Sequence, residues 1–364
     1  MRDDPKIGTV RARAFTIPTD APEADGTFAW DRTILVVAEV EAGGETGLGY
    51  SYTDASVAPL IEAALAPRLA GLSAFDIPRA GAVLWGAVRN LGRSGLAATA
   101  ISALDSALWD LKARLLDLPL ATLFGQARER AEIYGSGGFT SYDDGHLRAQ
   151  LAGWVEQDGC RAVKMKIGSE PERDPARMEA AKAAIGAAHL FIDANGAFTP
   201  KRAAAVAGLA AQFGVAWFEE PVSSDDPAGL ASVRAAAPAG MEIAAGEYAY
   251  TLDDLRGLLE AGAVDVAQAD VTRCGGYSGF LKVATLCEAA HIDLSGHCAP
   301  ALHLPAAVAA PRFRHLEWFH DHVRIERMLF DGAPVPRDGT IAPDLTRPGH
   351  GLTLRTPDAD AYAV

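Results

Sequence analysis

The sequence has little cysteine, no long apolar run and no excess of basic residues, and each shortage excludes a class of protein. Its 364 residues include four cysteines without a C-x-x-C pair, which is sparse for this length and indicates reduced thiols. No apolar stretch approaches membrane-spanning length and the first residues lack the apolar core of a secretory signal, so we expect a cytoplasmic protein without a membrane partner. The formal net charge of -14, without a basic stripe, argues against nucleic-acid binding.

The first third of the chain reads as a small α+β domain. Residues alternate as β-strands do over 7–14, 33–40 and 46–52, with a glycine turn at 43–44 and a polar loop over 16–32. Helical periodicity follows over 57–69, 77–89 and 95–116. We therefore expect an antiparallel sheet with helices to be complete before the next part begins.

From residue 131 onward, short apolar segments alternate with alanine-rich helical sequence, which predicts an α/β fold. Eight strands are expected, over 133–136, 162–167, 190–193, 216–219, 242–245, 264–267, 292–295 and 315–318. This alternation is typical of a parallel (β/α), or TIM, barrel, in which the carboxyl ends of the strands meet at one mouth. Candidate functional residues are therefore those at the strand ends.

Two lysines lie two residues apart on the second expected strand. Lys164 and Lys166 share a face because strand side chains alternate. On a semi-buried face, mutual repulsion and lost solvent would lower the pKa of one lysine toward neutrality and let it act as a base. If this K-x-K motif stood alone, two solvated lysines on an exposed strand would be the better interpretation. The ionisable residues at the ends of the later strands argue against that interpretation.

An ionisable residue stands near the end of each strand from the second to the eighth. In order they are Lys166, Asp193, Glu219, Glu247, Asp270, His297 and Glu317, at intervals of 20 to 28 residues, or about one βα unit. The three carboxylates Asp193, Glu219 and Glu247 come from adjacent strands and would repel one another without a cation. Oxygen-only ligands favour Mg²⁺ over zinc. Salt bridges to Arg or Lys are the structural alternative for any one of them.

For the remaining residues at or near the strand ends, we expect roles in supporting the metal ligands, in binding the substrate or in catalysis. Glu220 points away from its neighbour Glu219, so a role behind the metal ligands is expected. Asn195 could reach the substrate or the metal's water shell, or cap its loop. Asp270 can fix the tautomer of His297, which makes this pair a base that faces Lys166 across the barrel. A protonated Glu317 could donate a hydrogen bond to an oxygen gaining charge; its structural alternative is pairing with His315, His320 or His322.

These residues together resemble the enolase superfamily, in its mandelate racemase subgroup. The resemblance covers nearly the whole chain and rests on 103–110, 164–166, 193–195, 217–221, 246–247, the tail 348–352 and the single residues Asp270, His297 and Glu317. It implies a modified (β/α)₇β barrel over 129–334 and an N-terminal α+β capping domain over 1–128, completed by 335–364. It also implies a homo-oligomer.

The resemblance implies a chemistry as well. One Mg²⁺ would sit on Asp193, Glu219 and Glu247, and a proton α to a carboxylate would be removed by Lys166 or by His297 with Asp270. Lys164 would contact the substrate carboxylate, and Glu317 would donate a hydrogen bond to the enediolate. The partner is thus a small carboxylate.

The choice of reaction depends on the substrate. A β-hydroxyl acid would lose water, with His297 as general acid, to give a 2-keto-3-deoxy acid. Polar groups in 16–32 and 47–53, with Arg32 and Tyr50 as substrate-binding candidates, suit a polyhydroxylated acid and favour an acid-sugar dehydratase. The alternative is a racemase or epimerase of a 2-hydroxy acid. A non-catalytic sugar-acid binding protein is disfavoured, because such a scaffold has no use for two bases.

Overall fold

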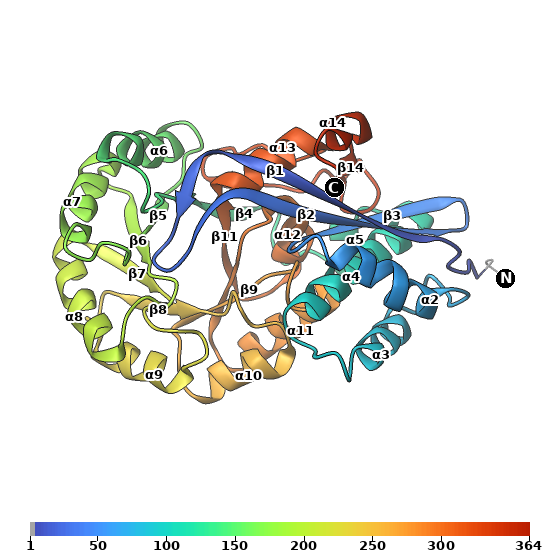
Figure 1. Ribbon diagram of the computed structural model, residues 1–364, viewed down its shortest axis with the longest axis horizontal. Coiled ribbons are helices and arrows are strands. Elements are labelled where there is room, and N and C mark those ends of the chain that lie inside the picture. The colour runs from blue at the N-terminus through green and yellow to red at the C-terminus, as the bar shows by residue number, and fades with distance from the viewer. Residues whose placement is uncertain (1–3) are drawn as a thin grey trace.

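The computed structural model describes residues 4–364 and places a small sheet with helices beside a closed barrel (Figure 1). The sheet is antiparallel, in the order β1 (Val10–Ala24), β2 (Ala29–Ala42) and β3 (Glu45–Tyr52). The helical segments that follow are α1 (Val57–Leu60), the π-helical η1 (Ile61–Leu65), α2 (Ala66–Leu69), α3 (Ile77–Ala87), α4 (Leu96–Leu115) and α5 (Leu120–Phe124). The predicted α+β arrangement is confirmed.

The long helix α4 lies directly on strand β3. A Cβ atom at Gly49 would stand 2.2 Å from the carbonyl oxygen of Ala103, so only glycine lets the strand approach the helix this closely. Farther along α4, the carboxylate of Asp110 accepts hydrogen bonds from the backbone amides of Leu48 and His350, each at 2.9 Å. This carboxylate ties the sheet and the C-terminal tail to one helix.

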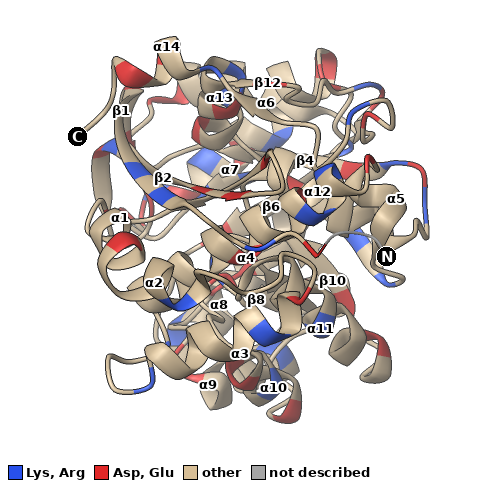
Figure 2. Cartoon of the chain, turned by 90° about the vertical axis from the view of Figure 1, so that its right-hand side faces the viewer, with Lys and Arg blue, Asp and Glu red and all other residues tan. Residues whose placement is uncertain are grey.

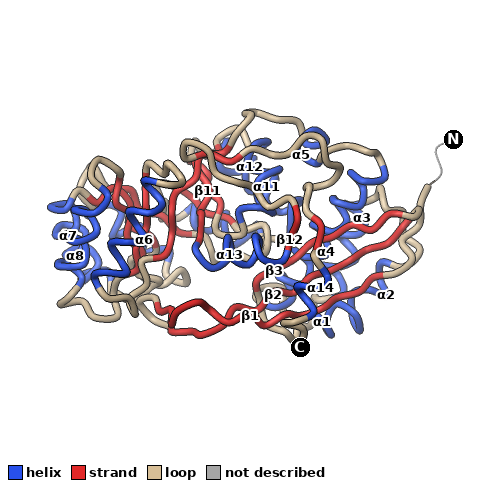
Figure 3. The backbone as a smooth tube through the Cα atoms, turned by 90° about the horizontal axis from the view of Figure 1, so that it is seen from above, coloured by secondary structure: helices blue, strands red, loops and turns tan. Residues whose placement is uncertain are grey.

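The segment predicted as a polar loop over 16–32 extends the first two strands, so that prediction was wrong. The strands β1 and β2 continue to within a few residues of each other, with an irregular register between Pro18 and Glu23. Polar residues made the segment read as a loop. Its prolines are compatible with a strand, because β1 is an edge strand and an edge irregularity is where a sheet tolerates proline. The resulting hairpin reaches from the sheet along the barrel, as Figures 1 and 3 both show.

Eight parallel strands close the barrel, as predicted. Hydrogen bonding runs from β4 to β11 in chain order, and β11 pairs with β4. The strands are β4 (Ala131–Gly137), β5 (Ala162–Lys166), β6 (His189–Asp193), β7 (Val215–Glu219), β8 (Glu242–Ala245), β9 (Val266–Ala269), β10 (Asp293–Gly296) and β11 (Phe313–Phe319). The sixth of these, β9, begins two residues later than predicted.

Helices connect all consecutive barrel strands. They are α6 (Asp144–Glu156), α7 (Asp174–Ile185), α8 (Pro200–Ala210), which continues into the 3₁₀ turn η2 (Ala211–Phe213), α9 (Pro227–Ala236), α10 (Leu252–Glu260), α11 (Gly276–Ala289) and α12 (Pro300–Ala309). A further helix, α13 (His320–Leu329), follows the last strand. Within residues 4–364, none of the helices has the length and apolarity needed to cross a membrane. In Figure 2, acidic and basic residues are interspersed over the elements.

An apolar layer forms the floor of the barrel interior. Its members are Tyr134, Ala162, Phe191, Trp217, Ala244 and Val266, all buried, and the rings of Phe191 and Trp217 stack at 5.2 Å. Two residues farther along three of these strands stand Lys164, Asp193 and Glu219. Because alternate residues face the interior, the strands change from apolar to charged toward their carboxyl ends.

The C-terminal residues contact both parts of the molecule. The short strand β13 (Thr340–Ile341) pairs with the start of β4, and β12 (Phe330–Asp331) pairs with β14 (Thr353–Leu354). After α14 (Thr356–Asp360), the amide of Val364 donates to the carbonyl of Ala14 on β1 at 3.1 Å. The domain boundaries at 128 and 335 stay predictions.

Tyr50 joins the sheet to α13. Its buried hydroxyl donates to Glu326 Oε1 at 2.6 Å, and its ring stacks on Phe330. The structure therefore corrects the prediction that Tyr50 contacts the substrate. Tyr50 and Tyr52 share one face of β3, but only Tyr52, at the end of the strand, reaches the cavity described below.

We expect Tyr50→Phe to lower the free energy of unfolding by about 1–3 kcal/mol, because the buried Glu326 carboxyl would lose a hydrogen bond. Denaturant titration measures the change. Tyr52→Phe is the matched control with a smaller expected loss, since its hydroxyl bonds the His322 carbonyl at a longer 3.3 Å. Unchanged stability together with a raised KM in Tyr50→Phe would return this residue to the substrate site.

Candidate active site

The predicted strand-end residues gather around one cavity of about 370 Å³ at the barrel mouth. Its lining includes Lys166, Asn195, Glu247, His297 and Glu317, together with residues of the β1–β2 hairpin. The other predicted residues of the ring, Lys164, Asp193, Glu219 and Asp270, are buried behind this surface. Folding thus collects residues spread over more than 150 positions of sequence.

Both lysines contact carboxylates. Lys164 Nζ lies 2.6 Å from Glu219 Oε1 and 2.7 Å from Glu317 Oε1, and Lys166 Nζ lies 2.5 Å from Asp193 Oδ2. Burial alone would lower both lysine pKa values, but these carboxylates raise them above the ordinary value. The expected fall toward neutrality is therefore not found in this charge state, because repulsion between the lysines is outweighed by three adjacent acids.

Glu317 is held as a hydrogen-bond acceptor. Burial would raise its pKa, but Lys164 and then His297 lower it well below its usual range. Ser136 Oγ donates to Oε1 at 2.6 Å and the Cys298 amide donates to Oε2 at 3.1 Å. The alternative pairings with His315, His320 and His322 are not found, since these rings bond Ser295, Asp20 and the Ala299 amide. A donor role for Glu317 would require it to gain a proton.

Three buried carboxylates form a group suited to a hard cation. One oxygen from each of Asp193, Glu219 and Glu247 lies within 4.8 Å of the others. Burial and the neighbouring Asp193 charge raise the pKa of Glu219 to about 8, even though Lys164 opposes this. The Oε2 atom of Glu247 is buried, and its nearest ionic partner among the described residues is His297 Nε2, at 3.0 Å. An oxygen-only set of three carboxylates fits Mg²⁺, even though Lys164 and Lys166 offset part of its charge.

His297 and Asp270 form the predicted pair. His297 Nδ1 lies 2.8 Å from Asp270 Oδ2, and Asp270 Oδ1 accepts a hydrogen bond from the Thr272 amide at 2.6 Å. This fixes Asp270 and leaves Nε2 of the ring near Glu247 Oε2, at 3.0 Å. Burial would lower the pKa of His297, but Cys298, Glu247 and Glu317, with the Asp270 hydrogen bond, hold it well above its usual value.

Lys166 and His297 reach the cavity from separate sides. Lys166 ends β5, and His297 follows β10, with β6 to β9 between them on one side of the barrel and β4 and β11 on the other. Both line the cavity. A small molecule inside it can therefore face an amine on one side and an imidazole on the other.

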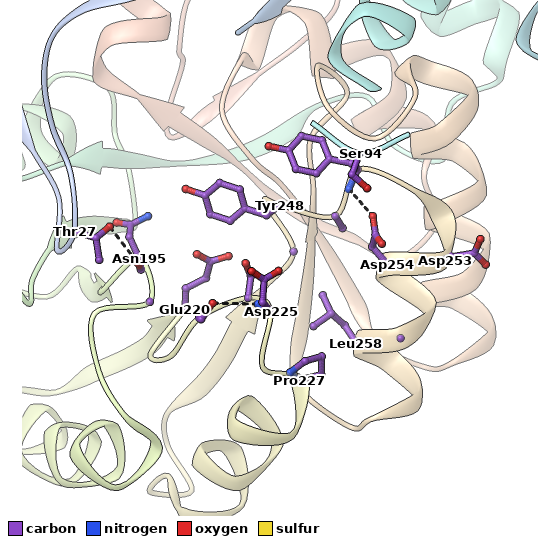
Figure 4. Close-up of a pocket in the computed structure, with 17 residues that line it drawn as sticks. Thr27, Ser94, Asn195, Glu220, Asp225, Pro227, Tyr248, Asp253, Asp254 and Leu258 are labelled. Atoms are coloured by element: carbon purple, nitrogen blue, oxygen red, sulfur yellow. Dashed lines mark hydrogen bonds between the residues drawn. The ribbon is translucent and has the colours of Figure 1, made fainter. Parts of the chain in front are cut away.

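A second hollow of about 780 Å³ adjoins the first, and Asn195 and Tyr248 line both (Figure 4). Glu220 lines this hollow, is buried, and its Oε1 has no hydrogen-bond partner among the described residues. Burial, with the charges of Glu247 and Asp193, raises its pKa well above the usual range. Asn195 Oδ1 likewise has no partner among the described residues, while the backbone N–H of Asn195 donates to Asp193 Oδ1 at 2.9 Å.

The hairpin supplies the outer wall of the 370 Å³ cavity. Arg32 lines it as predicted but is largely exposed and pairs with Asp31 at 3.0 Å. Phe28 and Trp30, four and two residues before Arg32, line it as well and were missed. The signal for them was their alternation with Arg32, which the incorrect loop prediction hid.

Arg273 is a further residue that sequence reasoning missed. It lines the cavity, with Nε 3.5 Å from Asp270 Oδ2 and Nη1 3.7 Å from Glu247 Oε1. Its guanidinium also stacks over Tyr248, at 5.2 Å from the ring centre. A cation three residues after Asp270 was the available signal. Cys298 also lines the cavity, and its Sγ lies 3.3 Å from His297 Nε2.

Comparisons with known families match both parts of the chain. Residues 13–125 match the N-terminal domain of the mandelate racemase / muconate lactonizing enzyme family, and residues 146–359 match the enolase C-terminal domain-like family. A curated relative, the 3,6-anhydro-α-L-galactonate cycloisomerase of Streptomyces coelicolor, is 34% identical over 96% of this chain and 97% of its own. Other relatives include sugar-acid dehydratases and an epimerase.

Solved structures agree with these matches. A mandelate racemase/muconate lactonizing enzyme-like protein from Rubrobacter xylanophilus is 48% identical, with a TM-score of 0.96 over 99% of this chain and all of its own. The L-talarate dehydratase of Polaromonas sp. JS666, solved with Mg and L-glucarate, is 32% identical, with a TM-score of 0.89 over 99% of this chain and 98% of its own.

We expect Asp270→Asn to lower the pKa of His297, because the carboxylate at Nδ1 helps to hold the imidazolium. NMR titration of the His297 ring, in protein treated with EDTA, measures the shift toward lower pH. The control is Asp265→Asn, which removes an acid paired with Arg234 at 2.7 Å and should leave that titration unchanged. Identical His297 titrations in wild type and Asp270→Asn would contradict the assigned pair.

Proposed function

The chain belongs to the enolase superfamily, in its mandelate racemase / muconate lactonizing enzyme branch, and from that premise we propose that it dehydrates an acid sugar to a 2-keto-3-deoxy acid. The observation that supports this most is the placement of Lys166 and His297 on separate sides of one cavity, beside three buried carboxylates. A base in such a place can remove a proton α to a bound carboxylate.

Asp193, Glu219 and Glu247 would hold Mg²⁺. When bound, this ion supplies positive charge that stabilises the second negative charge, which the substrate carboxylate gains when its α-proton is removed. The proposal draws support from the oxygen-only donor set and from relatives solved with magnesium.

Lys164 would place the substrate carboxylate. It is a fully buried ammonium group at the floor of the site, 5.6 Å from the centre of the Tyr134 ring. Its raised pKa keeps it cationic, so it can balance charge that grows on the substrate during proton removal. Glu317, which contacts Lys164, would donate a hydrogen bond to an oxygen of the substrate carboxylate only after taking up a proton. Asn195 and Arg32 would bind hydroxyl or carboxylate groups farther along the substrate.

Elimination needs one base and one acid. Neutral Lys166 would accept the α-proton at Nζ, and the electron pair of the C–H bond would delocalise into the carboxylate to give an enediolate. As the β-hydroxyl leaves, this charge would return from the carboxylate oxygens to form the carbon–carbon double bond. His297 would give its Nε2 proton to that hydroxyl, so that water departs, and the resulting enol would tautomerise to the keto acid. Asp270 orients the ring throughout. The reverse assignment, with His297 as base, uses the same atoms on a substrate of the other configuration.

The alternative function is racemisation or epimerisation. The same two bases would serve it, with one removing the proton and the other returning a proton on the opposite face. An epimerase among the relatives keeps this alternative in place. Dehydratases predominate among the relatives named above, and the cavity combines Arg32, Arg273, Thr33, Thr53 and Asn195, which suits a polyhydroxylated acid. A binding protein without catalysis would leave the base pair without a use.

We expect Mg²⁺ to raise the thermal stability of the protein, by about 2.7 kcal/mol at a hundredfold excess over Kd. Glu219→Gln should abolish the Mg²⁺-dependent rise, which differential scanning calorimetry measures. Glu220→Gln, the adjacent carboxylate facing the second hollow, is the matched control and should keep it. Equal Mg²⁺ responses in the two variants would contradict the ligand assignment.

A screen of monoacid and diacid sugars with Mg²⁺, read by semicarbazide absorbance of 2-keto-3-deoxy acids, tests the reaction. Lys166→Ala and His297→Asn should each lower kcat by about 10²–10⁴-fold, because each removes an acid or base. Lys201→Ala, at an exposed lysine, is the control. Inversion of configuration without keto acid would move the assignment to an epimerase, and no turnover across the screen would contradict the dehydratase.

A further inference from the structure

Two acids of the hairpin and one histidine of the barrel meet outside the catalytic cavity. Asp20 and Glu23 lie on β1, and His320 begins α13, directly after β11. One ligand atom from each of the three lies within 4.8 Å of the other two. His320 Nε2 stands 3.1 Å from both carboxylate oxygens of Asp20. These residues play no part in the proposed reaction.

Glu23 is the unusual member of this group. Its side chain is 1% exposed, and while Oε2 accepts a hydrogen bond from Trp30 Nε1 at 2.7 Å, Oε1 has no partner among the described residues. Burial, followed by the charge of Asp321, raises the pKa of Glu23 to about 8. A buried acceptor without a donor is costly, and a cation would satisfy it.

Neighbouring basic residues do not satisfy this oxygen. Arg324, whose charge lies near Glu23, pairs with Asp321 and donates to the Pro18 carbonyl at 2.7 Å. Trp30 packs edge-on against Phe139, so the other wall of the group is aromatic. A carboxylate oxygen of Glu23 lies within 4.8 Å of ligand atoms of Asp20 and His320, so the three side chains can share one ion.

We propose that Asp20, Glu23 and His320 form a second metal site, which binds a first-row divalent cation of the Zn²⁺ class. One imidazole nitrogen and two carboxylate oxygens are the donor set that such ions accept, with water completing the shell. Because one donor is a nitrogen, the site should prefer Zn²⁺ to Mg²⁺, unlike the oxygen-only group at the barrel mouth.

An ion here would fasten the hairpin to the barrel. Two ligands belong to β1 and the third follows the strand that carries Glu317. Glu23 also holds the indole of Trp30, which lines the catalytic cavity. Occupancy would thus fix one wall of the cavity without touching the reacting atoms. The site stands independently of the proposed reaction.

The test is the Zn²⁺ content of the protein after equilibrium dialysis against micromolar Zn²⁺ with excess Mg²⁺, which competes for the oxygen-only group. Wild type should retain about one Zn²⁺ per chain. His320→Asn and Glu23→Gln should each weaken retention at least tenfold, and the glutamine keeps an acceptor for Trp30. Glu219→Gln and His189→Asn, at an exposed histidine, should retain Zn²⁺ as wild type does.

Folding of His320→Asn and Glu23→Gln is checked by the Mg²⁺-dependent thermal shift, which both should keep. A change in tryptophan fluorescence on Zn²⁺ addition that is absent in Trp30→Phe would place the ion beside the hairpin. Wild type that retains no Zn²⁺, or His320→Asn that retains as much as wild type, would overturn the proposal.

Discussion

Compensation of buried charge at the barrel mouth is the constraint on which the rest of the structure depends. Lys164 and Lys166 are buried side by side, and each would be costly without the carboxylates of Asp193, Glu219 and Glu317. These partners meet the lysines only because the strands pair in one register, in which Lys166 is opposite Asp193 and Asp193 is opposite Glu219. A slip of one residue on any of these strands would point a charged side chain outward, into the apolar space between the strands and the surrounding helices. The strand register of the closed barrel therefore brings the catalytic charges together, and the pairing of these charges disfavours any other register.

The barrel alone does not enclose the site. The hairpin of β1 and β2 forms its outer wall, and α13 binds the sheet through Tyr50 and Glu326 instead of standing free after the last strand. Asp110 holds the sheet and the tail to one helix. The contacts that position the cavity wall are thus distant from the reacting groups, so a substitution there can change substrate binding without altering a catalytic residue.

Sequence predicted the eight strands and the residues at their ends, because short apolar segments followed by ionisable residues are local patterns that a parallel barrel preserves. It did not predict the hairpin over 16–32, since polar residues hide an edge strand whose pairing depends on the distant β2. It misplaced Tyr50 because one face of β3 packs on α13, some 270 residues later in the chain. It also gave the wrong direction for the lysine pKa values, which depend on acids of three other strands.

Exchange of the substrate α-proton with solvent deuterium tests the central claim most directly, because it reports proton removal whether elimination, epimerisation or simple return follows. We predict Mg²⁺-dependent deuterium incorporation into acid sugars, with Lys166→Ala abolishing exchange for one α-configuration and His297→Asn for the other. Acid sugars that bind with Mg²⁺ but show no exchange with the wild-type protein would contradict the account.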